Sequence, residues 1–307
     1  MKFTFSNISL NYFCRILLTL CLLYCPATLA DSVIYADILK AEDYRLRYNL
    51  ALGGQKAIDI KDYTPTKVGS QREIVEMIIL QKALYLGGEK STIAFNPKDS
   101  LTLREVTSLV KGDSLLYGNT LWFEMIKDYQ GSLYISDPLI RYGEYEAGFY
   151  TSRSNKKALS TTMETLKDLK VITSSQWGAD WRALHNSPVQ TINFMGSWID
   201  MLSMVEYQVV DAMLINFSLQ EDLSLMFDDK TYIPIPNIKI MLPGSRHFVV
   251  SKKHPNGAQV FNALNKGIKI MRESGEIEKL YRQAGFINSK VKGWSIANST
   301  MLTVDAK

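Results

Sequence analysis

Residues 166–178 have the sequence LKDLKVITSSQWG, and this stretch indicates how the rest of the chain is built. Its first eight residues predict a short helix that leads into a strand. The next residues, 173–178, predict a polar turn that opens another helix. Farther along, residues 197–207 predict a helix and residues 209–215 a strand. Strands that alternate with helices in this way are typical of an α/β protein and not of an all-β protein.

The same alternation extends toward the N-terminus. Residues 70–86 predict a helix with Ser70 as its N-cap. Residues 93–95 predict a strand that the following Asn-Pro pair ends. The first core strand lies at residues 33–36 or at residues 57–60, and the pattern leaves both positions open.

The alternation also extends toward the C-terminus. Residues 247–251 predict a strand, and residues 256–271 predict a helix whose apolar side chains share one face. Residues 277–284 carry a second helical stripe of apolar side chains. After Val291 the chain turns polar, so we expect residues 291–307 to form a poorly ordered tail.

Composition excludes several classes of protein. The chain has 307 residues, 35 Lys+Arg against 31 Asp+Glu, and 46% hydrophobic residues, which is ordinary for a globular protein. A formal net charge of +4, scattered along the chain, does not indicate a nucleic-acid-binding surface. The three cysteines, Cys14, Cys21 and Cys25, all lie near the N-terminus. The rest of the chain therefore holds no disulfide framework, no cysteine–zinc site and no cysteine nucleophile.

The N-terminal segment has the features of an export signal. Residues 16–25 form an apolar run, and Thr28 and Ala30 supply small residues at the spacing that a signal peptidase accepts. The run is too short to cross a bilayer, which takes about 20 residues. We expect residues 1–30 to be a signal peptide and the remaining protein to be exported to the periplasm as a soluble chain. Two alternatives stay open, a retained anchor and a lipoprotein, although the bulky Tyr24 precedes the last cysteine.

Signatures of catalysis and metal binding are missing from the sequence. His185, His247 and His254 each stand apart from other potential ligands, so we expect no metal site. The chain has no Gly-x-Ser-x-Gly, no Gly-x-x-x-x-Gly-Lys and no Gly-x-Gly-x-x-Gly motif, so we expect no nucleotide cofactor. The sequence therefore favours a binding protein over an enzyme, with no cofactor.

Several segments together resemble a known family. Residues 166–214 resemble lobe 2 of bacterial family-3 extracellular solute-binding proteins. Residues 248–255 and the helical block at 275–281 resemble the return strand and the C-terminal helices of that family. Residues 136–140 (SDPLI) resemble the segment that precedes the first crossing between the two lobes of that family. The similarity covers most of residues 90–290. It depends on the order and spacing of these segments and not on any single motif.

The resemblance implies a type II periplasmic binding protein fold, in which two α/β lobes are joined by two hinge crossings. The crossings are expected near residues 142–146 and 251–254. Lobe 1 is then discontinuous and comprises residues 31–145 and 252–290, and lobe 2 comprises residues 146–251. The ligand is expected in the crevice between the lobes, where strand ends and helix N-termini supply unpaired N–H groups. Closure of the lobes excludes water from it.

The candidate ligand-binding residues follow predicted strands, open predicted helices or lie near a predicted crossing. The same serines also suit an ordinary helix N-cap, and a tryptophan in this position also suits the core. The candidates are Tyr35, Asp37, Asn119, Thr120, Trp122, Arg141, Ser174, Ser175, Gln176, Trp177 and Asn216.

Two departures from the family pattern bear on the ligand. Amino-acid-binding members carry an acidic residue five positions after the Asp of an Asp-Ala pair, and that position is Asn216 here, after Asp211. They also carry an Arg in the lobe-1 turn, whereas residues 118–124 contain none. A neutral amide does not replace a charge-assisted hydrogen bond. The sequence therefore disfavours a plain α-amino acid and leaves the identity of the small polar ligand open.

Four functions stay open at this point. The preferred one is a monomeric solute-binding protein that delivers its ligand to an ABC-type membrane importer. The second is a sensor module that reports ligand occupancy to a membrane receptor. The third is a dehydratase-like enzyme, which needs an acid or base such as Asp37, Glu124 or Asp180 in the cleft. The fourth is a protein whose cleft is vestigial and that acts through its surface.

Overall fold

The computed structural model describes residues 33–39, 44–65, 71–98 and 103–299. The predicted signal peptide, the predicted N-cap Ser70 and residues 300–307 of the predicted tail lie outside the described residues. Within the described part, no helix has the length and apolar character needed to cross a membrane. Helices and strands alternate along the chain, so the predicted α/β class is confirmed.

Five strands form the first sheet, in the order β2-β1-β3-β13-β5. Strands β1, β2 and β3 are parallel, and β13 is antiparallel to β3 and β5. Residues 57–59 form a 3-10 turn, η1, so the first core strand is the one predicted at 33–36. The bounds are Val33–Leu39 (β1), Thr92–Lys98 (β2), Leu116–Tyr117 (β3), Leu133–Ile135 (β5) and Val249–Ser251 (β13).

Strand β2 runs through Asn96-Pro97, where the sequence predicted its end. Proline lacks the N–H that a central strand needs, but an edge strand tolerates it. The order of the sheet places β2 at an edge, which accounts for the difference.

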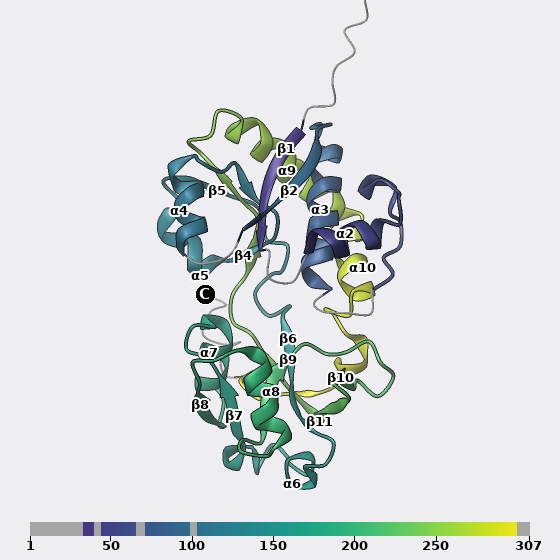
Figure 1. Ribbon diagram of the computed structural model, residues 1–307, viewed down its shortest axis with the longest axis vertical. Helices are drawn as coiled ribbons and strands as arrows, with labels where there is room; N and C mark the ends of the chain where they lie inside the picture. Colours follow the sequence, from purple (N-terminus) through teal and green to yellow (C-terminus); the bar gives the residue numbers. More distant parts are fainter. Residues whose placement is uncertain (1–32, 40–43, 66–70, 99–102, 300–307) are drawn as a thin grey trace, which may run out of the picture. The chain divides into compact units, whose positions relative to one another are not determined.

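Helices from both ends of the chain pack on the first sheet, and Figure 1 shows α3, α9 and α10 together beside it. Helix α3 ends where Gly88 adopts φ +110°, a left-handed conformation that glycine adopts without strain. The helices are α2 (Tyr44–Leu52), α3 (Arg72–Gly87), α4 (Leu103–Lys111), α5 (Phe123–Ile126), α9 (Gly257–Glu273) and α10 (Glu276–Gln283), with the 3-10 turns η1 (Ala57–Asp59) and η2 (Lys127–Tyr129).

The second sheet has the order β10-β11-β6-β9-β7-β8, with β14 beside β11. Strand β7 is parallel to β8 and β9, and β6 is antiparallel to β9 and β11. The strands are β6 (Glu146–Ser152), β7 (Lys170–Thr173), β8 (Gln190–Asn193), β9 (Ala212–Ile215), β10 (Leu225–Phe227), β11 (Lys230–Met241) and β14 (Ser295–Ile296). The helices are α6 (Lys156–Leu159), η3 (Leu166–Asp168), α7 (Gly178–His185) and α8 (Trp198–Glu206).

The chain passes from the first sheet to the second between β5 and β6, and it returns between β11 and β13. The return begins after Met241, and the short strand β12 (Arg246–His247) already pairs with β4 (Leu121–Trp122). The predicted crossing at residues 251–254 is therefore wrong. Of the strand predicted at 247–251, residues 249–251 form β13 in the first sheet and His247 belongs to β12. The crossing is marked instead by the pair Pro243-Gly244, a common turn signal.

The prediction of a poorly ordered tail after Val291 is wrong for residues 291–299. Strand β14 adds to the second sheet, and Asn298 is buried and bonded through its amide to both the N–H and the C=O of Met241. The side-chain amide of Asn298 thus satisfies the backbone N–H and C=O of Met241 on β11. The polar residues of this segment therefore help to order it. The chain thus makes a third passage between the sheets, from α10 through the turn η4 (Ser289–Val291) to β14.

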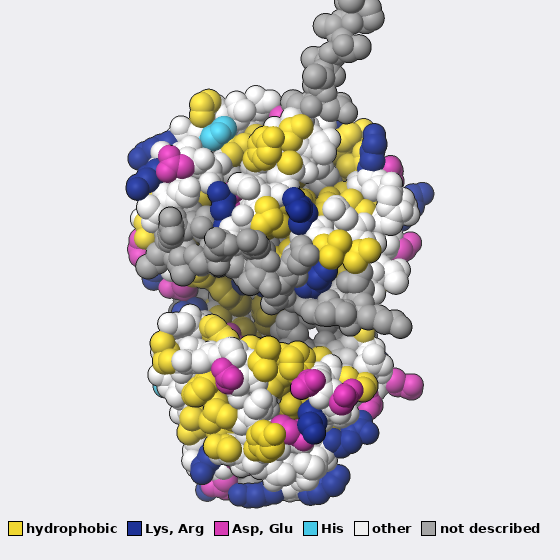
Figure 2. Space-filling model, viewed as in Figure 1, with side chains coloured by type: hydrophobic (Ala, Val, Ile, Leu, Met, Phe, Trp, Pro, Cys, Tyr) yellow, Lys and Arg dark blue, Asp and Glu magenta, His cyan; other side chains and the backbone are white. Residues whose placement is uncertain are grey.

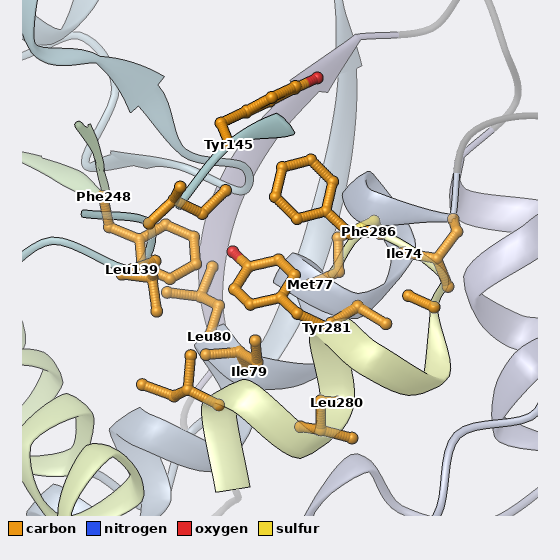
Figure 3. Close-up of a cluster of buried hydrophobic side chains, with 14 of the residues drawn as sticks. Ile74, Met77, Ile79, Leu80, Leu139, Tyr145, Phe248, Leu280, Tyr281 and Phe286 are labelled. Atoms are coloured by element: carbon orange, nitrogen blue, oxygen red, sulfur yellow. The ribbon is translucent and has the colours of Figure 1, made fainter. Parts of the chain in front are cut away.

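The helices of the first sheet share one apolar core. Figure 3 shows Met77 and Leu80 of α3 beside Tyr281 of α10, with Tyr145 and Phe286 near them. The rings of Tyr145 and Phe286 meet edge to face, with centroids 4.4 Å apart. Aromatic pairs of this kind contribute about 0.5–1.5 kcal/mol beyond the area they bury.

Helices α3 and α9 approach each other closely through two glycines. A Cβ at Gly267 of α9 would overlap the backbone of Ala83, and a Cβ at Gly87 of α3 would overlap that of Ala263. We predict that Gly267→Ala lowers the free energy of unfolding in urea by about 1–3 kcal/mol, because overpacking outweighs the better helix propensity of alanine. The control is Gly131→Ala, where a Cβ meets nothing within 4 Å. Equal stability of the two variants would contradict the prediction.

Candidate functional site

Three parallel strands of the second sheet end at the same edge, since β7 lies between β8 and β9. The chain continues from β7 into residues 174–177, from β8 into residues 194–195 and from β9 into Asn216. Carboxyl ends of parallel strands are where α/β proteins hold ligands. The structure brings five predicted site residues to this edge: Ser174, Ser175, Gln176, Trp177 and Asn216.

The turn after β7 is held mostly by its own backbone and by neighbours from β8. The N–H of Ser175 donates to Asn193 Oδ1 at 2.9 Å, and the N–H of Gln176 lies 3.3 Å from Ser174 Oγ. The hydroxyls of Ser174 and Ser175 point at the sulfur of Met195, at 3.7 and 3.8 Å. A thioether is a weak acceptor. The two hydroxyls are therefore able to turn to a stronger acceptor, such as a ligand oxygen.

Two side-chain amides at this edge have no hydrogen-bond partner among the described residues. In the described structure, the side chains of Gln176 and Asn216 make no hydrogen bond to the protein, and Gln176 is exposed. Trp177 is half-buried and packs against the second-sheet core. Figure 2 shows hydrophobic side chains on the surface over α7 and α8. Ile199 on α8 is 54% exposed, and Met195 just after β8 is 62% exposed. This edge offers amides, hydroxyls and apolar surface, and its groups are predominantly uncharged.

The turn after β3 is different, because its donors are already used. Thr120 donates from its N–H to Glu76 Oε2 at 3.0 Å and from its hydroxyl to Glu76 Oε1 at 2.6 Å. Arg246 in turn donates to Thr120 Oγ1 at 2.9 Å and to its carbonyl oxygen at 2.5 Å. Asn119 donates to the carbonyl of Glu73, while its buried Oδ1 has no partner among the described residues. Thr120 has no donor left for a ligand, and Asn119 has a free acceptor.

Glu76 is the centre of a buried charged cluster. It is fully buried, and it accepts from Arg72 at 3.1 and 3.2 Å and from the hydroxyl of Tyr281 at 3.3 Å. Arg72 also pairs with Glu73, and Arg246 Nε lies 3.9 Å from Glu76 Oε1. Two arginines thus face two glutamates, and the charges of the cluster balance.

The pKa values of the two arginines show how unequal their surroundings are. Burial lowers the pKa of Arg246, and the charge of Arg72 lowers it further. Burial also acts to lower the pKa of Arg72, but Glu73 and Glu76 together outweigh it and leave the pKa raised. Both arginines stay charged at neutral pH.

Trp122 lies against this cluster and not in open solvent. The guanidinium carbon of Arg246 is 4.8 Å from the centre of the indole ring, and the ring of Tyr145 is 5.3 Å away. Arg246 comes from β12, far along the sequence from the turn. The turn at residues 118–124 lacks an arginine of its own, but a neighbouring strand supplies one.

Asp180, in the first turn of α7, lies within electrostatic range of this cluster. Burial raises its pKa to about 6, and the hydrogen bond to its own backbone N–H and the charge of Arg246 act in the opposite direction. Its charge also raises the pKa of Tyr145, where burial is the larger cause. The charge of Arg246 on β12 therefore acts on Asp180, in the helix that follows the turn after β7.

Tyr35 and Asp37 occupy a different place, a pocket of about 250 Å³ beside the first sheet. Asp37 is buried and accepts from Asn96 at 3.0 Å and from Ser114 at 2.5 Å, and Lys98 Nζ is 3.6 Å away. Tyr35 is 65% exposed. The structure does not bring these two residues together with the other candidates.

The fold matches solved structures, although no protein-family model and no curated protein matches the sequence. A probable amino-acid ABC transporter extracellular-binding protein, ytmK from Bacillus subtilis, matches with a TM-score of 0.52 at 13% identity, over 83% of this chain and 98% of that one. The periplasmic VFT2 domain of BvgS from Bordetella pertussis matches with a TM-score of 0.48 at 14% identity, over 83% and 93% of the two chains. The chain has the two-lobed fold of type II periplasmic binding proteins. The resemblance stated from the sequence is confirmed at the level of the fold.

In this fold the first sheet belongs to lobe 1 and the second sheet to lobe 2. Arg141 is exposed in the first passage between the lobes, and its N–H donates to Glu144 Oε2 at 2.7 Å. Glu124, one of the carboxylates considered for catalysis, forms an ion pair with Lys127 at 2.8 Å, and both side chains are more than 40% exposed. Asp37, Glu124 and Asp180 therefore lie in three separate surroundings.

Histidines and acidic residues do not converge in the part of the chain that the structure describes. No group of three or more His, Cys, Asp and Glu side chains there is placed to hold a metal ion. His247 lies 2.7 Å from the carbonyl oxygen of Ser136 and 2.7 Å from Ser245 Oγ. Burial lowers its pKa, so it is neutral at neutral pH.

Four residues at these two turns were not predicted from the sequence: Glu76, Arg246, Asn193 and Met195. The sequence does indicate that Glu76 is a buried charge, because it stands inside the apolar run IVEMIIL (residues 74–80). A charge in such a run needs a buried partner. Arg246, Asn193 and Met195 had no comparable signal, because strand pairing brings them to their positions.

We predict that Glu76→Gln lowers the free energy of unfolding by about 3 kcal/mol or more, because it leaves a buried arginine without its counter-charge. Urea denaturation measures the loss. The control is Glu278→Gln, which removes an exposed ion pair with Arg282 and is expected to lower stability by less than about 1 kcal/mol. Similar losses in both variants would show that the Glu76 cluster does not stabilise lobe 1.

We predict that Asp180 makes stability fall as pH rises. Its pKa is raised from 3.8 to about 6, so the folded protein holds this proton after the unfolded chain has lost it. The unfolding free energy contributed by Asp180 is therefore present below pH 3.8 and is lost progressively up to about pH 6. The free energy of unfolding in urea is measured against pH for the wild type and for Asp180→Asn. The wild-type value minus the Asp180→Asn value gives the pH dependence that Asp180 contributes. A flat or rising difference between pH 4 and 6 would contradict the assignment.

Proposed function

We propose that this protein is a periplasmic solute-binding protein that holds a small polar molecule between its two lobes. The observation that supports it is the set of uncommitted hydroxyl and amide groups beside Trp177 at the carboxyl edge of the second sheet. Such a crevice is the usual ligand position in open α/β sheets. We include in the proposal that residues 1–30 direct export and that the protein is a monomer that delivers its ligand to an ABC-type importer.

The ligand we propose is polar and is not a plain α-amino acid. Asn216 cannot supply the negative charge that an ammonium group requires. Thr120 has given its donors to Glu76, and the charge of Arg246 is balanced within its cluster. A ligand carboxylate would have to displace Glu76, a fully buried carboxylate that accepts hydrogen bonds from Arg72, Thr120 and Tyr281. Neutral groups at the edge of the second sheet fit a ligand of hydroxyl, amide or similar chemistry.

A binding role is supported over an enzymatic one. A hydrolytic or dehydratase reaction requires an acid or base at the bound substrate. The three carboxylates considered lie apart, and Glu124 is exposed and paired with Lys127. We therefore propose that the protein binds its ligand without turning it over.

The test is a thermal-shift screen of neutral and charged polar metabolites against the protein purified after export. A ligand of the folded state adds about 2.7 kcal/mol of stability at a hundredfold excess over its Kd. Mass spectrometry of the same sample is expected to find Asp31 as the first residue. Absence of any stabilising metabolite across the panel would contradict the proposed function.

We predict that Gln176→Ala and Asn216→Ala each weaken the best hit by about 3- to 10-fold, the effect of one hydrogen bond. Neither side chain bonds to the protein, so the stability of the ligand-free protein is expected to change by less than about 0.5 kcal/mol. Asn262→Ala, at an exposed position of α9, is the control and is expected to bind as the wild type does. Isothermal titration measures the affinities. Unchanged affinity in both site variants would place the ligand elsewhere.

A further inference from the structure

Three stretches of chain connect the lobes. The first is residues 136–145, between β5 and β6, and the second is residues 242–245, between β11 and β12. The third leads from α10 of lobe 1 to β14 of lobe 2. Movement of one lobe relative to the other requires changes in all three stretches.

One buried ammonium group joins all three where they enter lobe 2. Lys239 lies on β11, which leads into the second connection, and only 3% of the residue is exposed. Its Nζ forms an ion pair at 2.7 Å with Glu146, the residue at which the first connection enters β6. It also donates to the carbonyl oxygen of Val291 at 2.9 Å and lies 3.5 Å from that of Lys292, both in the third connection. These contacts use the three donors that an ammonium group has.

Neighbouring contacts fix the third connection to the same place. The N–H of Ala297 donates to the carbonyl of Lys239 at 2.8 Å. Asn298 accepts from the N–H of Met241 at 3.1 Å and donates to its carbonyl at 2.8 Å. Phe286, at the start of this connection, packs against Tyr145 of the first. The connections therefore form one bonded unit and are not independent linkers.

We propose that Lys239 is a positioning residue that fixes the three connections relative to one another and so sets how far the lobes open. The proposal depends on the proposed function, because lobe movement is what captures the ligand. A buried ammonium without its partners is strongly unfavourable. A hinge movement that separates Glu146 or Val291 from Lys239 is therefore opposed, and motion is confined to the residues between these anchors.

Lobe 1 contains a matched control. Lys82 is 5% exposed, pairs with Glu276 at 2.6 Å and donates to the carbonyl oxygen of Ile60 at 2.6 Å, with that of Ile58 at 3.5 Å. Its contacts are thus one carboxylate and two carbonyls, as for Lys239. All of them lie on α3, α10 and the segment around η1, within lobe 1.

The experiment compares Lys239→Met with Lys82→Met in the ligand-free, exported protein. No cysteine follows Cys25, so Lys157→Cys on α6 and Lys269→Cys on α9 give one spin label on each lobe. Urea denaturation is expected to show a similar loss of stability in the two methionine variants. Pulsed EPR is expected to show a broader distance distribution for Lys239→Met and a wild-type distribution for Lys82→Met.

A distribution for Lys239→Met as narrow as that of Lys82→Met would overturn the proposal, as would equal broadening in both. If Lys239→Met does not fold, Glu146→Gln replaces it, because it removes the counter-charge and keeps the carbonyl contacts of Lys239. Broadening in Glu146→Gln supports the proposal, and a wild-type distribution overturns it. These measurements need no ligand, so their outcome is separate from that of the metabolite screen.

Discussion

The carboxylate of Glu76 joins four elements of lobe 1: its own helix α3, the turn after β3, strand β12 and helix α10. Its partners are Arg72, Thr120, Arg246 and Tyr281. A buried carboxylate is stable only when its lone pairs accept hydrogen bonds and its charge is countered. Each element must therefore be in place before the cluster is complete. This requirement fixes the turn after β3.

The cluster also determines which chemistry is left for a ligand. In lobe 1 the donors of Thr120 and the charges of the Glu76 cluster are used by the protein itself. In lobe 2 the carboxyl edge of the sheet keeps two hydroxyls that donate only to a thioether sulfur, and two side-chain amides that make no hydrogen bond to the described protein. Hydrogen bonds to uncommitted groups require no protein bond to be broken. Under the proposed function, recognition of the ligand depends on lobe 2, with Trp122 and Asn119 as the groups that lobe 1 can still offer.

The sequence predicted what depends on local pattern. Apolar periodicity located α8, α9 and α10, and the turn chemistry after β7 located Ser174 to Trp177. The prediction failed where pairing with a distant strand determines the position of a segment. The strand at residues 249–251 was assigned to the wrong lobe, because an apolar strand does not show which sheet it joins. The prediction of a tail failed for residues 291–299, because they bond to β11, a partner that the pattern of the segment does not reveal.

Charged residues inside apolar runs are the sequence feature from which more of the fold could have been predicted. Glu76 stands in IVEMIIL and Lys239 in NIKIM (residues 237–241), and each proves to be the centre of a set of contacts between distant segments. An ammonium group has three donors, so it can hold three segments only if they converge. A lysine at such a position therefore predicts convergence of chain segments before their partners are known. In this fold the convergence falls where the lobes are joined, and the same ion that stabilises lobe 2 thereby limits its movement against lobe 1.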